Sequence, residues 1–92
     1  MTTIYKYDFR VADEVTLSIP GFCYLCKIGK QNSELGILTL WCAVMPDVQD
    51  SATICLKVYG TGHPIPEEIT GQNYIDTVFD GQFVWHIFRI WK

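Results

Sequence analysis

The sequence predicts an all-β domain, a small antiparallel sandwich or a partly open barrel of about six to seven short strands. Apolar side chains recur in short runs with a two-residue period, which is the period of a half-buried strand. Turn residues such as Pro20-Gly21 and Pro46-Asp47 separate these runs at regular intervals. No stretch of ten residues carries a helical period. A chain of 92 residues is long enough for one core, so a single domain over residues 1–92 is expected.

The first two strands are expected over residues 2–11 and 15–19. Residues 2–11 alternate between an aromatic face, with Tyr5, Tyr7 and Phe9, and a mostly charged face. Residues 15–19 repeat the alternation over a shorter length. The proline that follows ends this run, because it has no backbone N–H to donate.

Three more strands are expected over residues 22–28, 37–45 and 52–59. Residues 37–45 are apolar almost throughout, which predicts an interior position in a sheet. Residues 29–36 (GKQNSELG) are the most polar stretch of the chain and predict an exposed loop.

A hairpin over residues 74–91 completes the expected sheets. Asp80-Gly81 is a dipeptide typical of the centre of a tight turn, where both residues take a positive φ angle. The second strand, residues 83–91, is apolar on both faces and therefore needs an interior position. Residues 60–71, before the hairpin, are irregular, and at most one helical turn is expected near Pro66–Ile69.

Charge and hydropathy exclude several classes of protein. Seven Lys and Arg against ten Asp and Glu give a formal net charge of −3. This charge is too weak for a mimic of DNA and has the wrong sign for an autonomous nucleic-acid binder. The first residues alternate as a strand does and show no signal peptide, and no apolar run approaches the roughly 20 residues that cross a bilayer. We therefore expect a cytoplasmic protein with no membrane contact.

The four cysteines are expected to be reduced thiols, because the cytosol disfavours disulfides. Cys23 and Cys26 have the CxxC spacing of a zinc site, but they lie in a strand-like run where residues three apart point to opposite faces. Cys42 and Cys55 could still complete a four-thiolate site. We favour core cysteines, since Cys is among the most often buried residue types. A thioredoxin-like function is not expected, because no βαβ pattern surrounds the motif.

No catalytic group of residues is recognisable. Residues Gly60 to Pro64 (GTGHP) have the glycines of a phosphate-binding loop, but no lysine and no helix follow them, so a kinked connection is favoured. His63 and His86 are the only histidines, and no nucleophile motif accompanies them. We expect His86 to be a hydrogen-bonded structural residue. We also expect no enzyme activity, no cofactor and no bound metal.

The loop after the third strand is the main candidate for a binding site. Lys27 and Lys30 flank Gln31, Asn32 and Ser33, so hydrogen-bond donors cluster on an exposed loop. A solvated loop without function is the alternative, and it is favoured on general grounds. Exposed tyrosines would add to a binding surface, because Tyr is enriched in interfaces. The candidates are Tyr5, Tyr24 and Tyr59.

Three segments carry a resemblance to a known family. They are the opening TIYKY, the central GTGHPIP (Gly60–Pro66) and the ending YIDTVFDGQFVWHIF (Tyr74–Phe88). In this order they resemble a family of small phage-encoded proteins with a GTGHPI loop and a VWHxF finish, and the chain is similar to type I-F anti-CRISPR proteins. The resemblance implies a stoichiometric inhibitor, which binds the guide-RNA-loaded type I-F surveillance complex (the Csy complex) and stops its hybridisation with target DNA.

The resemblance also implies the partners. These are the Cas7-type backbone of the complex, with the Cas8 and Cas5 subunits and the guide RNA as further candidates. The protein is expected to be monomeric when free and to act in the cytoplasm of the infected bacterial host. Two alternatives stay open, a phage virion or assembly component that self-associates and a nucleotide-binding sponge that uses the Gly60–Pro64 loop.

We expect the contacts to come from exposed cations and amides, because lysines pair with phosphates and amides bond to base edges. The expected contact residues are Lys27, Lys30, Gln31, Asn32 and Ser33, with Arg10 and Lys57 nearby.

Overall fold

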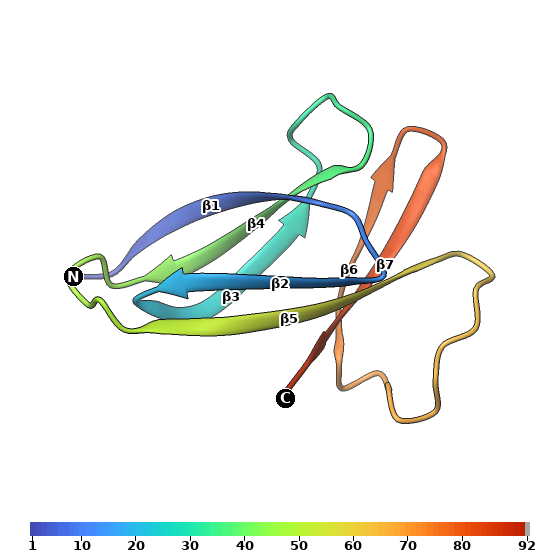
Figure 1. Cartoon of the computed structure of the whole chain (residues 1–92). Helices are drawn as coiled ribbons and strands as arrows, with labels where there is room; N and C mark the ends of the chain where they lie inside the picture. Colours follow the sequence, from blue (N-terminus) through green and yellow to red (C-terminus); the bar gives the residue numbers. More distant parts are fainter. Residues whose placement is uncertain (92) are drawn as a thin grey trace.

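The computed structural model describes residues 1–91, which form seven strands and no helix (Figure 1). The strands are β1 (Thr3–Arg10), β2 (Glu14–Pro20), β3 (Phe22–Gly29), β4 (Ile37–Val44), β5 (Ser51–Gly60), β6 (Tyr74–Asp80) and β7 (Phe83–Ile90). All lie where the two-residue period predicts them, because that period is a local property of the chain. Within this part of the chain no helix is long and apolar enough to cross a membrane.

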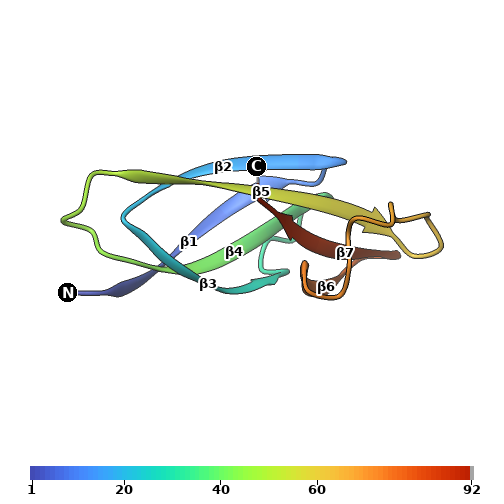
Figure 2. The same cartoon turned by 90° about the horizontal axis from the view of Figure 1, so that it is seen from below.

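The strands form two antiparallel sheets that pack as two layers (Figure 2). The three-stranded sheet has the order β1-β4-β3, and the four-stranded sheet has the order β2-β5-β7-β6. Neither sheet closes on itself, so the fold is a sandwich and the all-β prediction is confirmed. β4 and β7 are interior strands, as their apolar sequences predict.

The core lies between the inner faces of the two sheets. In the three-stranded sheet, β4 contributes Leu38 and Leu40, and in the four-stranded sheet β5 contributes Ile54 and Leu56, all with 0% exposure. Burying one such side chain stabilises the fold by about 1.5–3 kcal/mol. Ile87 of β7 is equally buried, so the core continues beneath the hairpin.

The β6–β7 hairpin is displaced toward one end of the sandwich. The displacement arises because β5 pairs with β2 along its first half, from Ser51 to Lys57, and with β7 along its second half, from Cys55 to Gly60. The end of β3 lies beside β6, so two edge strands of different sheets meet there (Figure 2).

The hairpin turn is centred on Gly81 and Gln82, one residue later than predicted. Asp80 pairs with Phe83, and Gly81 alone of the turn residues has a positive φ angle, 62°. A positive φ at the first central residue only is the pattern of a type II′ turn. The predicted Asp80-Gly81 centre is therefore wrong. Asp80 ends β6 because its carboxylate is fully buried and hydrogen-bonded inside the protein.

Residues 61–73 form the long connection from β5 to β6, which cannot be short because β7 lies between these strands (Figure 1). The N–H of Ile69 donates to the carbonyl of Pro66 at 3.0 Å. This bond closes a single turn, within the limit of one helical turn that the sequence predicts.

Candidate functional site

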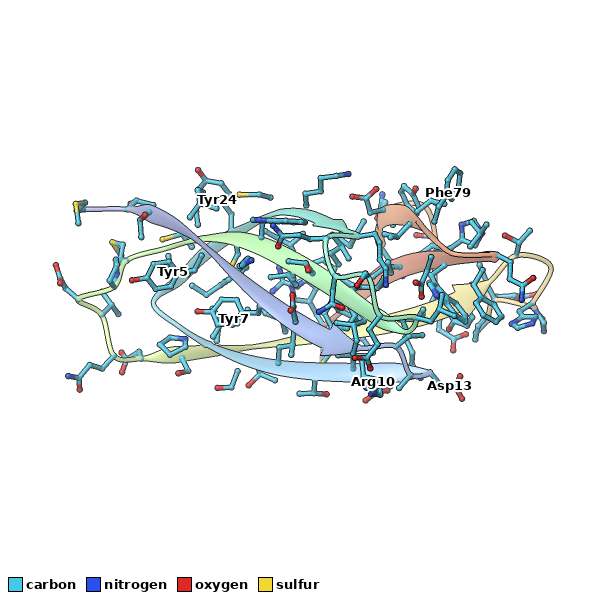
Figure 3. All side chains as sticks on the ribbon, turned by 90° about the horizontal axis from the view of Figure 1, so that it is seen from above. Tyr5, Tyr7, Arg10, Asp13, Tyr24 and Phe79 are labelled. Carbon is cyan, nitrogen blue, oxygen red and sulfur yellow. The ribbon has the colours of Figure 1, made fainter. Side chains whose placement is uncertain are left out.

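The outer face of the three-stranded sheet, which points away from the core, carries several of the predicted binding residues. Side chains in register lie side by side across an antiparallel sheet. Lys6, Trp41 and Lys27 form one row across β1, β4 and β3. Tyr24 stands in the next row with 60% of its surface exposed (Figure 3). A Cβ atom at Gly29 would lie 3.3 Å from the Trp41 ring and 3.6 Å from the Lys27 stem, so these side chains converge over that glycine.

Arg10 pairs with an exposed carboxylate, and Lys27, which is itself 63% exposed, pairs with a carboxylate that is 23% exposed. The Arg10 guanidinium is 2.9 Å from the Glu34 carboxylate, and the Lys27 ammonium is 3.1 Å from the Asp76 carboxylate. Exposed ion pairs of this kind are worth about 0–1 kcal/mol. Either cation can therefore exchange its carboxylate for a phosphate or for an acid of a partner at little cost.

Lys30, three residues further on, is engaged inside the protein. Its ammonium lies 2.8 Å from a carboxylate oxygen of Asp80 and donates to the carbonyls of Glu34 and Ile37. A lysine has three N–H donors, and three acceptors surround this one. Lys30 therefore ties the polar loop to the hairpin, and its three donors are already engaged within the protein.

Asp80 completes this internal contact from the hairpin side. Its second carboxylate oxygen accepts the N–H of Gly36 at 2.9 Å and the indole N–H of Trp85 at 3.0 Å. Burial by itself would raise the pKa of Asp80, but the hydrogen bonds and the charge of Lys30 outweigh burial and lower the pKa below its usual value. The carboxylate is held ionised, and it joins the polar loop and the hairpin into one unit.

The three residues predicted from the polar loop, Gln31, Asn32 and Ser33, differ in their surroundings. Gln31 accepts a hydrogen bond from the Lys6 ammonium at 2.8 Å, which holds it at the outer face. Asn32 accepts the N–H of Glu34 at 2.8 Å within the loop, and Ser33 is exposed.

Lys57 lies apart from this group. It stands on the outer face of the four-stranded sheet, 3.1 Å from Glu14. The fold therefore places Arg10, Lys27 and Gln31 on the side of the three-stranded sheet and Lys57 on the opposite face of the sandwich.

Two of the four cysteines lie outside the core, so the prediction of four core cysteines is wrong for Cys23 and Cys26. Both are exposed, because β3 carries two bulges that leave each of them without a partner residue on β4. Cys42 and Cys55 are buried, and burial raises the pKa of the Cys42 thiol. Among residues 1–91 no group of three potential ligands is arranged to hold a metal ion.

We expect two thiols to react rapidly with a thiol reagent in the folded protein and four to react after unfolding, because only Cys23 and Cys26 are exposed. Timed alkylation followed by mass spectrometry of peptides measures this. Rapid modification of Cys42 or Cys55 under native conditions would contradict the described packing.

His86 is the centre of a hydrogen-bond chain on the outer face of the four-stranded sheet. Its Nε2 lies 2.7 Å from the Thr61 hydroxyl, and its Nδ1 lies 3.0 Å from the Thr77 hydroxyl. Thr77 also bonds to the Tyr74 hydroxyl at 2.6 Å. Each ring nitrogen has a hydroxyl partner, so the predicted hydrogen bonding of His86 is confirmed.

Sequence reasoning missed Lys6, Trp41 and Phe79. Phe79 is 73% exposed (Figure 3). It borders a shallow groove of about 210 Å³ between residues 27–30 and 77–79. The alternation of the first strand did mark Lys6 as outward-facing, but its neighbours across the sheet depend on strand order. Strand order is not visible in a local pattern.

A family model matches the chain over residues 1–92, and its description is a domain of unknown function, DUF7352. The chain belongs to this family. No curated protein and no solved structure matches the chain.

Proposed function

We propose that this DUF7352 domain is a binding protein, a stoichiometric inhibitor of the type I-F CRISPR surveillance complex. The segments TIYKY, GTGHPIP and YIDTVFDGQFVWHIF support the proposal through their resemblance to type I-F anti-CRISPR proteins. The row of Lys6, Trp41 and Lys27, with Tyr24 beside it, is the observation that carries it. Cations next to accessible aromatic rings on a sheet face suit contact with single-stranded RNA.

The inhibitor would act by occupying the path of the target strand along the guide. Lys6 and Lys27 pair with guide phosphates, and Tyr24 packs against an unstacked base or against the Cas7-type backbone. The target strand then cannot form base pairs with the guide. No bond is made or broken, so each bound inhibitor blocks one complex.

A mimic of DNA is less well supported, because the acids near this face are paired with cations. Glu34 pairs with Arg10, and Asp76 pairs with Lys27. Asp8 accepts a hydrogen bond from the Thr39 hydroxyl at 2.6 Å. No uncompensated row of carboxylates is available along β1 or β3 to imitate a phosphate backbone.

Two matched charge reversals test the contact face. Lys27 and Lys57 are both lysines with a carboxylate at 3.1 Å, but they lie on opposite faces of the sandwich. We expect Lys27→Glu to weaken binding to the guide-loaded complex by about tenfold or more, and Lys57→Glu to change it by less than about twofold, because only Lys27 meets the partner.

The measurement is co-elution and titration of each variant with the guide-loaded complex, with target DNA added before or after. Circular dichroism verifies that both variants fold. Equal affinities of the two variants would contradict the contact face. Absence of any complex with the unmodified protein would overturn the inhibitor proposal itself.

A further inference from the structure

A second concave surface lies at the end of the four-stranded sheet, away from the outer face described above. It is a pocket of about 310 Å³, lined by the end of β5, the GTGHP loop and the start of β7. Small-molecule sites begin at about 300 Å³. The lining residues are Gly60, Thr61, His63, Gln82, Phe83, Val84 and Trp85.

Two stacked rings form one wall of the pocket. Phe83 and Trp85 have ring centroids 5.5 Å apart and planes inclined by 15°. The indole N–H of Trp85 donates to Asp80 at 3.0 Å, which fixes the orientation of the ring before any ligand arrives. Phe83 is 45% exposed, so a further planar group can continue the stack.

The GTGHP loop brings a third ring to the pocket. In the sheet, Gly60 is the partner residue of Trp85, and a Cβ atom at Gly60 would lie 3.0 Å from the His63 imidazole. The imidazole therefore sits directly over a glycine, on the same side of the sheet as the indole. The Thr61 hydroxyl is held at the rim by its 2.7 Å contact with His86.

Within the described part of the chain, the pocket also presents two unpaired polar side chains. The side chains of Gln82 and His63 have no hydrogen-bond partner within residues 1–91, so they can serve a ligand as donor and acceptor. None of the lining residues is Lys, Arg, Asp or Glu, so the pocket does not suit a phosphate or another charged group.

We infer that this pocket binds one unpaired nucleobase, a flat and neutral ring whose edge carries hydrogen-bond donors and acceptors. The base stacks on Phe83, and the amide of Gln82 meets its edge. The base can belong to a free nucleoside or to a single-stranded nucleic acid, which present the same ring. This inference is independent of the proposed inhibitor function, because it concerns the isolated protein.

Titration of the isolated, isotope-labelled protein with nucleosides and with short homopolymeric RNA tests the inference. The indole N–H resonance of Trp85 reports directly from the pocket. We expect this resonance to shift in a saturable manner with at least one nucleoside. Equal affinity for the nucleoside and the matching RNA would identify a site for the free ligand, and much tighter binding of the RNA would identify a base within a strand.

Two phenylalanine variants on the same hairpin provide the control. Phe83→Leu removes the ring that continues the stack, and Phe79→Leu removes a ring that is 73% exposed outside the pocket. We expect a loss of affinity of about tenfold for Phe83→Leu and of less than about twofold for Phe79→Leu. Gly60→Ala should also weaken binding, because the new methyl group displaces His63 without backbone strain. No saturable shift of Trp85 with any nucleoside or RNA, or equal losses in the two phenylalanine variants, would overturn the inference.

Discussion

Replacing Lys30 with methionine is expected to lower the free energy of unfolding by about 3 kcal/mol or more. The side chain of Asp80 is 0% exposed, and the Lys30 ammonium 2.8 Å away is the cation that compensates its charge. Methionine keeps the length of the side chain but leaves that carboxylate buried without its counter-ion. The carbonyls of Glu34 and Ile37 lose a donor in the same step. Urea unfolding followed by tryptophan fluorescence measures the loss.

Lys27→Met is the matched control. It makes the same chemical change at a lysine that is 63% exposed, so we expect a loss of no more than about 1 kcal/mol. Similar small losses in both variants would show that the Lys30–Asp80 contact does not hold the loop and the hairpin together.

The same ion pair makes stability depend on pH in a defined direction. The pKa of Asp80 is lower in the folded protein than its usual value, so the folded state favours the ionised form. The ionised Asp80 carboxylate makes its full contribution to the free energy of unfolding above its pKa in the unfolded chain, about 3.9. That contribution is lost as the pH falls through the lower pKa of the folded protein. As the pH falls from about 3.9 to the lower folded pKa of Asp80, we expect the free energy of unfolding to fall more steeply in the unmodified protein than in Asp80→Asn.

Replacing Gly21 with alanine is expected to destabilise the fold by about 3 kcal/mol, from backbone strain and overpacking together. Gly21 has a φ angle of 66°, and a Cβ atom there would lie 2.1 Å from the carbonyl oxygen of Met45. That carbonyl belongs to the backbone and cannot rotate away. The Gly21 N–H also donates to the Asp50 carbonyl, and the Gly21 carbonyl accepts the N–H of Met45, both at 2.8 Å. Displacing Gly21 therefore disturbs two connections between the sheets, the one from β2 to β3 and the one from β4 to β5.

Gly71→Ala is the control for this second prediction. Gly71 has no positive φ, and a Cβ atom there would meet nothing within 4 Å. We expect a change within about 0.5 kcal/mol in either direction. Thermal and urea unfolding of the two variants measure the difference, and equal stabilities would contradict the close packing at Gly21.

The strands and their burial were predictable from the sequence, because the two-residue period is carried by neighbours in the chain. The apolar faces of residues 37–45 and 83–91 predicted the interior strands β4 and β7 for the same reason. The centre of the hairpin turn was not predictable. The burial of Asp80 shifts it by one residue, and this burial depends on Lys30, fifty residues earlier in the chain.

The candidate sites depended on contacts between distant residues. Lys27 and Lys30 look alike in the sequence, but only Lys30 meets a fully buried carboxylate, so only Lys27 stays available to a partner. Cys23 and Cys26 are exposed because β3 bulges against β4, and Gly60 and Trp85 line one pocket because β5 and β7 pair in that register. The sequence by itself determined which segments are strands and which of their faces are apolar, since both follow from local periodicity. The tertiary structure decided which polar side chains are free to bind, because strand order and register choose the neighbours of each residue.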